Sequence, residues 1–127
     1  VSNSDVPWKV AALAGNVLDV AAGDNYVCAV IEMAAGSGDV HCWGDNTVGQ
    51  LGQGYANSSQ PTGGVVAPVR VKGVSKVTAL FAAYQSTCAL TVSQRVVCWG
   101  TNYYAQLGAG TFVSPITLPA AMKGLCA

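Results

Sequence analysis

The sequence predicts an all-β protein built from repeated sheets of four antiparallel strands. Three observations indicate this fold class: one long stretch occurs twice, other segments recur around it, and 15 glycines divide the apolar residues into short runs. These runs have the length of strands, and none approaches the roughly 18 apolar residues that a membrane-spanning helix needs. Self-similarity at a fixed spacing is typical of repeat architectures. We therefore expect repeated small sheets and no membrane span.

Residues 1–16 are expected to be the end of a preceding repeat. Pro7 begins a segment that resembles those after Pro68 and Pro119, in which apolar residues follow the proline together with a lysine or arginine. Proline donates no hydrogen bond to a sheet, so the pattern suits an edge strand entered through the proline. The sequence therefore predicts the same edge strand three times.

Two strands joined by a hairpin are expected next in each repeat. Residues 17–30 align with residues 77–90, cysteine on cysteine, and both segments contain small residues before the cysteine. Small residues favour a strand in a crowded place, such as the inner strands of a closed ring. Turn-forming segments at residues 34–39 and 91–95 then lead to a second cysteine strand.

The third strand of each repeat carries the clearest match. Residues 40–54 read V-H-C-W-G-D-N-T-V-G-Q-L-G-Q-G, and residues 96–110 read V-V-C-W-G-T-N-Y-Y-A-Q-L-G-A-G. We expect a turn at Gly44 and at Gly100, because glycine lets the chain reverse where a Cβ would clash. A short amide in the turn favours hydrogen bonds to the backbone, and a leucine anchors the loop to apolar surface; these residues are Asn46, Asn102, Leu51 and Leu107.

Each glycine loop is interpreted as one that ends its own sheet and packs on the next. A phosphate-binding loop would need a helix after the glycines and usually a lysine, and neither copy supplies them. The first repeat also carries a polar insertion over residues 55–64, expected to be an exposed loop. Asn57 in this loop begins the triplet N-S-S and is a candidate glycosylation site.

Together, the patterns A-A-G-x-x-x-x-C-A-[VL], V-x-C-W-G-x-N-x-x-x-Q-L-G-x-G and P-x-x-V resemble the repeat of the regulator of chromosome condensation family of β-propellers. The resemblance implies four-stranded blades, commonly seven in that family, of which residues 17–74 and 75–127 are two. The second is more degenerate, because Ala83 and Ala105 replace glycines of the pattern. A closed ring needs neighbouring blades. The chain is therefore expected to be a segment of a longer polypeptide or to associate with other chains.

The cysteines predict two disulfides, Cys28 with Cys42 and Cys88 with Cys98, on the two arms of each expected hairpin. Opposed residues in an antiparallel pair lie about 4.5–5.5 Å apart, a separation that a disulfide bridges. One alternative is that these cysteines are buried free thiols. Another is a zinc site, but one histidine and no C-x-x-C pair leave too few ligands for zinc. Cys126 is left for a bond to another blade or chain, or as a free thiol. Paired cysteines imply an oxidising, extracellular or cell-surface setting.

The sequence offers neither a strong net charge nor a recognisable set of catalytic residues, so we expect a protein that is not an enzyme. Charged residues make up 9% of the chain and the net charge is zero, so no basic stripe for nucleic acid is expected. His41, the single histidine, is expected on the surface beside Cys42 and has no second base with which to form a serine triad. We expect no catalytic residue, no cofactor and no metal site.

The function predicted from the sequence is that of an extracellular structural or protein-interaction module. Its partners would be other blades of the same propeller, other protein chains in an assembly, or a glycan. Aromatic side chains in loops are good anchors for a partner, although packing between blades is the alternative; here they are Tyr55, Tyr103, Tyr104 and Phe112. The other readings are a secreted protein inhibitor or glycan-binding propeller and, carried over from the resemblance, nuclear guanine-nucleotide exchange and chromatin binding. Neutral charge and paired cysteines speak against the nuclear reading.

Overall fold

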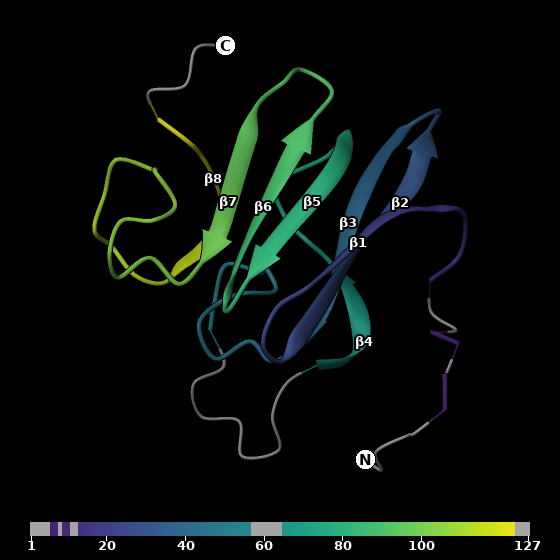
Figure 1. The fold of residues 1–127 in the computed structure, drawn as a ribbon, viewed down its shortest axis with the longest axis horizontal. Helices are drawn as coiled ribbons and strands as arrows, with labels where there is room; N and C mark the ends of the chain where they lie inside the picture. The colour runs from purple at the N-terminus through teal and green to yellow at the C-terminus, as the bar shows by residue number, and fades with distance from the viewer. Residues whose placement is uncertain (1–5, 8, 11–12, 57–64, 124–127) are drawn as a thin grey trace.

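The computed structural model describes residues 6–7, 9–10, 13–56 and 65–123, and all regular secondary structure among them is β-strand (Figure 1). The strands occur where the short apolar segments of the sequence predict them. Their bounds are β1 (Val17–Ala22), β2 (Tyr26–Ala34), β3 (Ser37–Gly44), β4 (Val65–Arg70), β5 (Val77–Ala83), β6 (Ser86–Thr91), β7 (Val96–Gly100) and β8 (Ile116–Ala121).

These strands form two antiparallel units of four. In the first unit β1 pairs with β2, β2 with β3 and β3 with β4, and β5 to β8 repeat the same order. One residue pair, Gly38 opposite Val77, links the two units, which lie side by side in Figure 1. Each unit is a four-stranded propeller blade, so the predicted fold class of about two blades is confirmed.

The segment before the first blade is described only in part, so the prediction that residues 1–16 end a preceding repeat stays a prediction. The sequence pattern after Pro7 predicts an edge strand, but the described residues before Val17 form no strand. Instead, the chain is tied to the end of β2: the Glu32 amide donates to the Asn16 carbonyl at 2.8 Å, and the Asn16 side chain donates to the Glu32 carboxylate at 3.0 Å.

The two later proline strands begin earlier than predicted. Pro68 and Pro119 lie inside β4 and β8 rather than at their first residues. In both pairings the register shifts between the cysteine and the glycine of the neighbouring strand, and the proline lies in this irregular stretch. Proline is tolerated there because a bulged edge strand has positions that donate no hydrogen bond to the sheet.

The hydrophobic core lies between the two blades. Val30 and Val40 of the first blade are fully buried against Leu80, Ala89 and Trp99 of the second. Burying a large apolar side chain contributes about 1.5–3 kcal/mol to stability, so these residues stabilise the packing of one blade on the other. The other face of each blade lies outside this shared core.

Candidate interaction surface

Each Cys-Trp strand ends in a glycine whose backbone only glycine adopts easily. Gly44 and Gly100 have φ angles of +110° and +106°. A Cβ at Gly100 would lie 2.2 Å from the carbonyl oxygen of Gln85, and one at Gly44 would lie 2.5 Å from that of Asn25. The chain therefore turns directly against the hairpin that precedes it, at the positions predicted from the sequence.

The loops that follow are ordered by the same hydrogen bonds in both blades. The Leu51 amide donates to the side-chain oxygen of Asn46, and the Leu107 amide donates to that of Asn102, each at 3.1 Å. The Asn46 amide group in turn donates to the Tyr55 carbonyl at 3.1 Å, and that of Asn102 donates to two carbonyls further along its loop. The asparagines and leucines are buried, so the expected roles of both residue types are confirmed.

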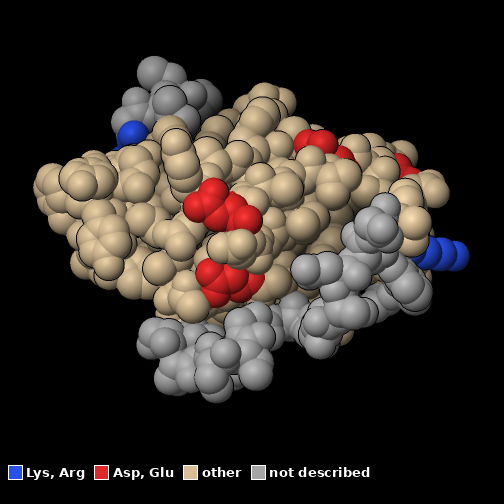
Figure 2. Space-filling model, turned by 60° about the horizontal axis from the view of Figure 1, so that its bottom comes forward, with Lys and Arg blue, Asp and Glu red and all other residues tan. Residues whose placement is uncertain are grey.

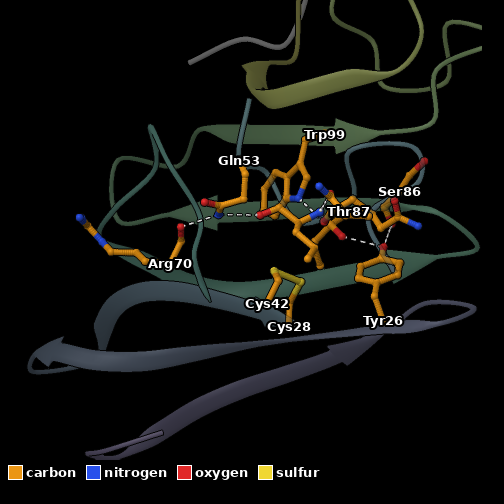
Figure 3. Close-up of a disulfide and its surroundings, with 11 residues drawn as sticks. Tyr26, Cys28, Cys42, Gln53, Arg70, Ser86, Thr87 and Trp99 are labelled. Carbon is orange, nitrogen blue, oxygen red and sulfur yellow. Dashed lines mark hydrogen bonds between the residues drawn. A yellow bond between two sulfur atoms is a disulfide. The ribbon is translucent and has the colours of Figure 1, made fainter. Parts of the chain in front are cut away.

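A disulfide crosses the middle of each blade. Cys28 and Cys42 lie opposite each other in the β2–β3 register and are bonded, with their Cα atoms 4.1 Å apart (Figure 3). Cys88 and Cys98 are bonded in the same way between β6 and β7, also with a Cα separation of 4.1 Å. The pairing is the one that the sequence predicted.

The glycine loop of the first blade packs on the second blade. The Trp99 indole N–H donates to the Gln50 carbonyl oxygen at 2.8 Å, and both residues are fully buried. The Gly54 amide donates to the Thr117 carbonyl at 2.9 Å, and a Cβ at Gly49 would lie 2.6 Å from Thr117 Cγ2. The interpretation of the loop as a connection to the next sheet is therefore confirmed.

Tyr26 makes a second polar contact between the blades. Its hydroxyl donates to the Ser86 carbonyl at 2.8 Å and lies 2.7 Å from the Thr87 hydroxyl, which then donates to it (Figure 3). Burial raises the pKa of Tyr26; the hydrogen bond from Thr87 opposes this rise, and the Asp24 carboxylate adds to it. The tyrosine is therefore held neutral at the blade interface.

Sequence reasoning missed these contacts between blades. The Leu80 amide also donates to the Asp19 carboxylate across the interface, at 2.8 Å. The available signal was the difference between the repeats, because Tyr26 aligns with Ser86 and Asp19 aligns with Ala79.

The second blade has a cavity on the face that points away from the first blade, which we call the outer cavity. It has a volume of about 330 Å³ and is lined by residues that include Phe81, Ser86, Cys88, Gln106 and Leu107. Phe81 is 61% exposed, although it lies in a strand beside the disulfide. The lining combines an aromatic ring, apolar surface and a few polar groups, as binding cavities usually do.

The aromatic residues predicted to contact partners are exposed. Tyr104 is 88% exposed, Phe112 78%, Tyr103 67% and Tyr55 51%. Tyr103, Tyr104 and Phe112 all lie in the loop between β7 and β8, which also contributes Gln106 and Leu107 to the outer cavity. The structure therefore gathers three of the four predicted contacts at the loop end of the second blade, whereas Tyr55 lies between β3 and β4 of the first blade. Two other predicted sites, Asn57 and Cys126, lie outside the described residues.

Charges and metal ligands are sparse on this part of the molecule. Figure 2 shows acidic side chains near the middle of one face and basic side chains only at its edges. His41 is partly buried rather than exposed as expected, and its Nδ1 is buried without a hydrogen-bond partner. The described residues contain no group of three or more potential metal ligands. No helix in the same residues is long and apolar enough to cross a membrane.

Comparisons with known proteins identify the repeat. Residues 37–90 match the family model described as the regulator of chromosome condensation (RCC1) repeat. The chain is 31% identical to alsin of Rattus norvegicus over 123 residues, which is 94% of this chain and 7% of alsin, and the figures are the same for alsin of Mus musculus. The chain thus spans a small part of these curated relatives.

Solved structures share the fold. Human WBSCR16 matches 85% of this chain with a TM-score of 0.66 and 21% identity, over 25% of its own length. Prp20p of Saccharomyces cerevisiae, whose structure was described with its binding to Gsp1p and histones, matches 86% with a TM-score of 0.71 and 18% identity. The same yeast protein bound to Kap60 matches 93% with a TM-score of 0.70. This chain covers 26% of the yeast protein in both structures, which corresponds to about two blades of a larger propeller.

Proposed function

We propose that this chain, in which residues 37–90 carry a regulator of chromosome condensation repeat, is a segment of a disulfide-stabilised β-propeller that acts as a non-enzymatic, extracellular or cell-surface interaction module. The observation that carries the proposal is the disulfide at the same position in both blades. Structural disulfides form and persist in oxidising compartments and are rare where thiols are kept reduced.

Protein partners are favoured by the exposed aromatic residues of the β7–β8 loop. Tyr103, Tyr104 and Phe112 present large apolar surfaces at the end of a rigid blade, where the side chains of an interface hot spot are usually found. The two yeast structures support this choice, because their descriptions name proteins as partners. Lys and Arg do not outnumber Asp and Glu, and the net charge is zero. A polyanion is therefore disfavoured as a partner.

The compartment is tested by the thiol state of the protein in its source cells. Rapid acid quenching, alkylation of free thiols and mass spectrometry of the peptides should show Cys28, Cys42, Cys88 and Cys98 in disulfides before any reductant is added. A protein that carries four alkylated thiols in the intact cell would refute the extracellular proposal. Cys126 reports separately on a bond to another chain.

The interaction role is tested with a photo-crosslinking amino acid placed at Tyr104. Expressed on its source cells, this variant should crosslink to a defined extracellular protein. Met33 is the matched control position, because it is 70% exposed but lies near the β2–β3 turn, at the end of the blade opposite the glycine loops. Crosslinking at Met33 that equals crosslinking at Tyr104 would show that the aromatic loop is not the contact surface.

A further inference from the structure

A second hollow lies where the connection between the two blades meets the second blade, and we call it the basic groove. It has a volume of about 480 Å³, within the range of binding clefts. Its walls are the connection between β4 and β5, the β6–β7 turn, and the adjoining ends of β7 and β8. In Figure 1 the β6–β7 turn lies at the top of the second blade. The groove is therefore at the opposite end of β7 from the glycine loop.

The basic groove opens on the face of the second blade that points to the first blade. Val97 lines the groove and also packs against the core that the two blades share. It lies two residues before Trp99 along β7, so both side chains are on the same face of the strand. The outer cavity is on the opposite face of this blade. A neighbour packed on that outer face would therefore leave the basic groove open.

Two cationic residues line the groove from different walls. Lys76 belongs to the connection between the blades, and Arg95 ends the β6–β7 turn. Both residues are exposed, and neither makes an ion pair within the part of the chain that the structure describes. No described residue of the lining is acidic. The groove therefore carries two positive charges without a counter-charge, although the chain as a whole has no net charge.

The acid in the adjoining hollow already has a cationic partner. Lys76 and Asp39 both line this adjoining hollow, but the Asp39 carboxylate lies 3.0 Å from the Arg70 guanidinium. Asp39 is thus held by another cation, and Lys76 stays available to a ligand of the basic groove. The repeat itself does not require the two cations, because Lys76 aligns with Asn16 and Arg95 aligns with Asp39.

The walls of the groove are held by hydrogen bonds. The Val92 amide donates to the Lys76 carbonyl at 2.9 Å, which joins the turn to the connection between the blades. The Thr91 amide donates to the Arg95 carbonyl at 3.0 Å, and the hydroxyls of Thr91 and Ser93 lie 2.9 Å apart. A site that is ordered before its ligand arrives loses less conformational entropy on binding. The groove is therefore arranged in advance for a ligand.

We infer that the basic groove binds an acidic peptide segment of a partner protein. A carboxylate accepts charge-assisted hydrogen bonds from guanidinium and ammonium groups, and these are stronger than neutral ones. The lining also contains the aliphatic side chains Val74, Val97 and Pro119. These suit the apolar residues that flank a carboxylate in a peptide and offer nothing to a free inorganic anion. A highly sulfated glycan is disfavoured, because it would use a broader basic surface than two cations provide.

This site goes beyond the proposed function, because the aromatic loop lies at the other end of the second blade. The test is a titration of the chain, with its disulfides intact, followed by ¹H–¹⁵N nuclear magnetic resonance. The probe is a blocked hexapeptide of alternating glutamate and valine, used up to about 5 mM to detect millimolar binding. The amide signals of Lys76, Ser93 and Arg95 should shift and saturate, whereas those of Tyr104 should not. The same peptide with glutamine in place of glutamate should cause no shift.

Variants identify the groups that bind the peptide. Lys76→Gln and Arg95→Gln keep the length of the side chain and remove its charge, and each should weaken binding at least about tenfold, as the loss of a hydrogen bond to a charged group does. Arg95→Lys should retain more affinity than Arg95→Gln. The matched control is Lys72→Gln, the same change in the same connection but at a residue that does not line the groove. It should bind like the parent, and the amide spectrum verifies that each variant is folded.

Three results would overturn the inference. The first is a peptide that causes no saturable shifts in the groove, or shifts equal to those of its glutamine form. The second is a loss for Lys72→Gln as large as that for Arg95→Gln, which would indicate attraction by net charge alone. The third is tighter binding of inorganic sulfate or of a sulfated disaccharide than of the peptide. Because the thiol state and the crosslinks at Tyr104 are measured independently, each of these results leaves the proposed function standing.

Discussion

Replacing Trp99 by phenylalanine should cost much more stability than the same change at Trp43. Trp99 is fully buried, and its N–H is the donor found 2.8 Å from the buried Gln50 carbonyl. Leaving a buried acceptor without a partner costs about 1–3 kcal/mol, and the smaller ring leaves a void that adds about 1 kcal/mol. The free energy of unfolding should therefore fall by roughly 2–4 kcal/mol, a large share of the 5–15 kcal/mol typical of a small protein.

The matched control is Trp43→Phe, at the same position of the other repeat. Trp43 is only partly buried, so its change should cost less than about 1 kcal/mol. Urea unfolding of both variants is followed by far-ultraviolet circular dichroism, because the substitutions alter tryptophan fluorescence. Equal losses for the two variants would refute the assignment of Trp99 as the packed contact between blades.

Three further outcomes are expected. Gly100→Ala should lower the free energy of unfolding by more than about 2 kcal/mol, because its Cβ would meet the backbone. The control is Gly73→Ala, which is also at positive φ but has open space around it. It should cost about 1–2 kcal/mol in the same urea assay. Replacing both Cys28 and Cys42 by alanine should cost about 3 kcal/mol, and titration with a reductant should then destabilise the variant less than the parent. Burial raises the pKa of Tyr26 above its unfolded value of about 10. The stability that the neutral tyrosine provides is therefore present below pH 10 and is lost as the pH rises through the folded pKa. Between pH 8 and pH 11 the free energy of unfolding should depend less on pH for Tyr26→Phe than for the parent.

Local features of the fold were predictable because each depends on residues close together in the sequence. The turns at Gly44 and Gly100 follow from a glycine directly after a strand, and the loop hydrogen bonds follow from an asparagine two residues later. The disulfides follow from cysteines on the two arms of a hairpin, where the register places them opposite each other. In each case the chain alone determines which groups can meet.

Features that depend on a neighbour were predicted less well. Pro68 and Pro119 lie inside strands, because the bulge that accommodates them is a property of the pairing with the neighbouring strand. His41 is partly buried although it alternates with core residues along β3.

The same distinction explains why the candidate site was only half predicted. Exposed aromatic residues in a turn-rich loop are visible in the sequence, and Tyr103, Tyr104 and Phe112 are exposed in the structure. The outer cavity is not visible, because it is formed by the hairpin turn of β5–β6 together with a loop about twenty residues further along. Only the three-dimensional arrangement brings Phe81 and Leu107 to the lining of one cavity.

The differences between the two repeats indicate how the chain divides its stability. Tyr26 and Asp19 give the internal interface polar contacts that fix one blade on the other, and these contacts add to the burial of Trp99. The aligned residues of the second blade, Ser86 and Ala79, lack the phenol and the carboxylate that make these two bonds. The interface between the two blades is therefore fixed by groups that only the first copy of the repeat carries.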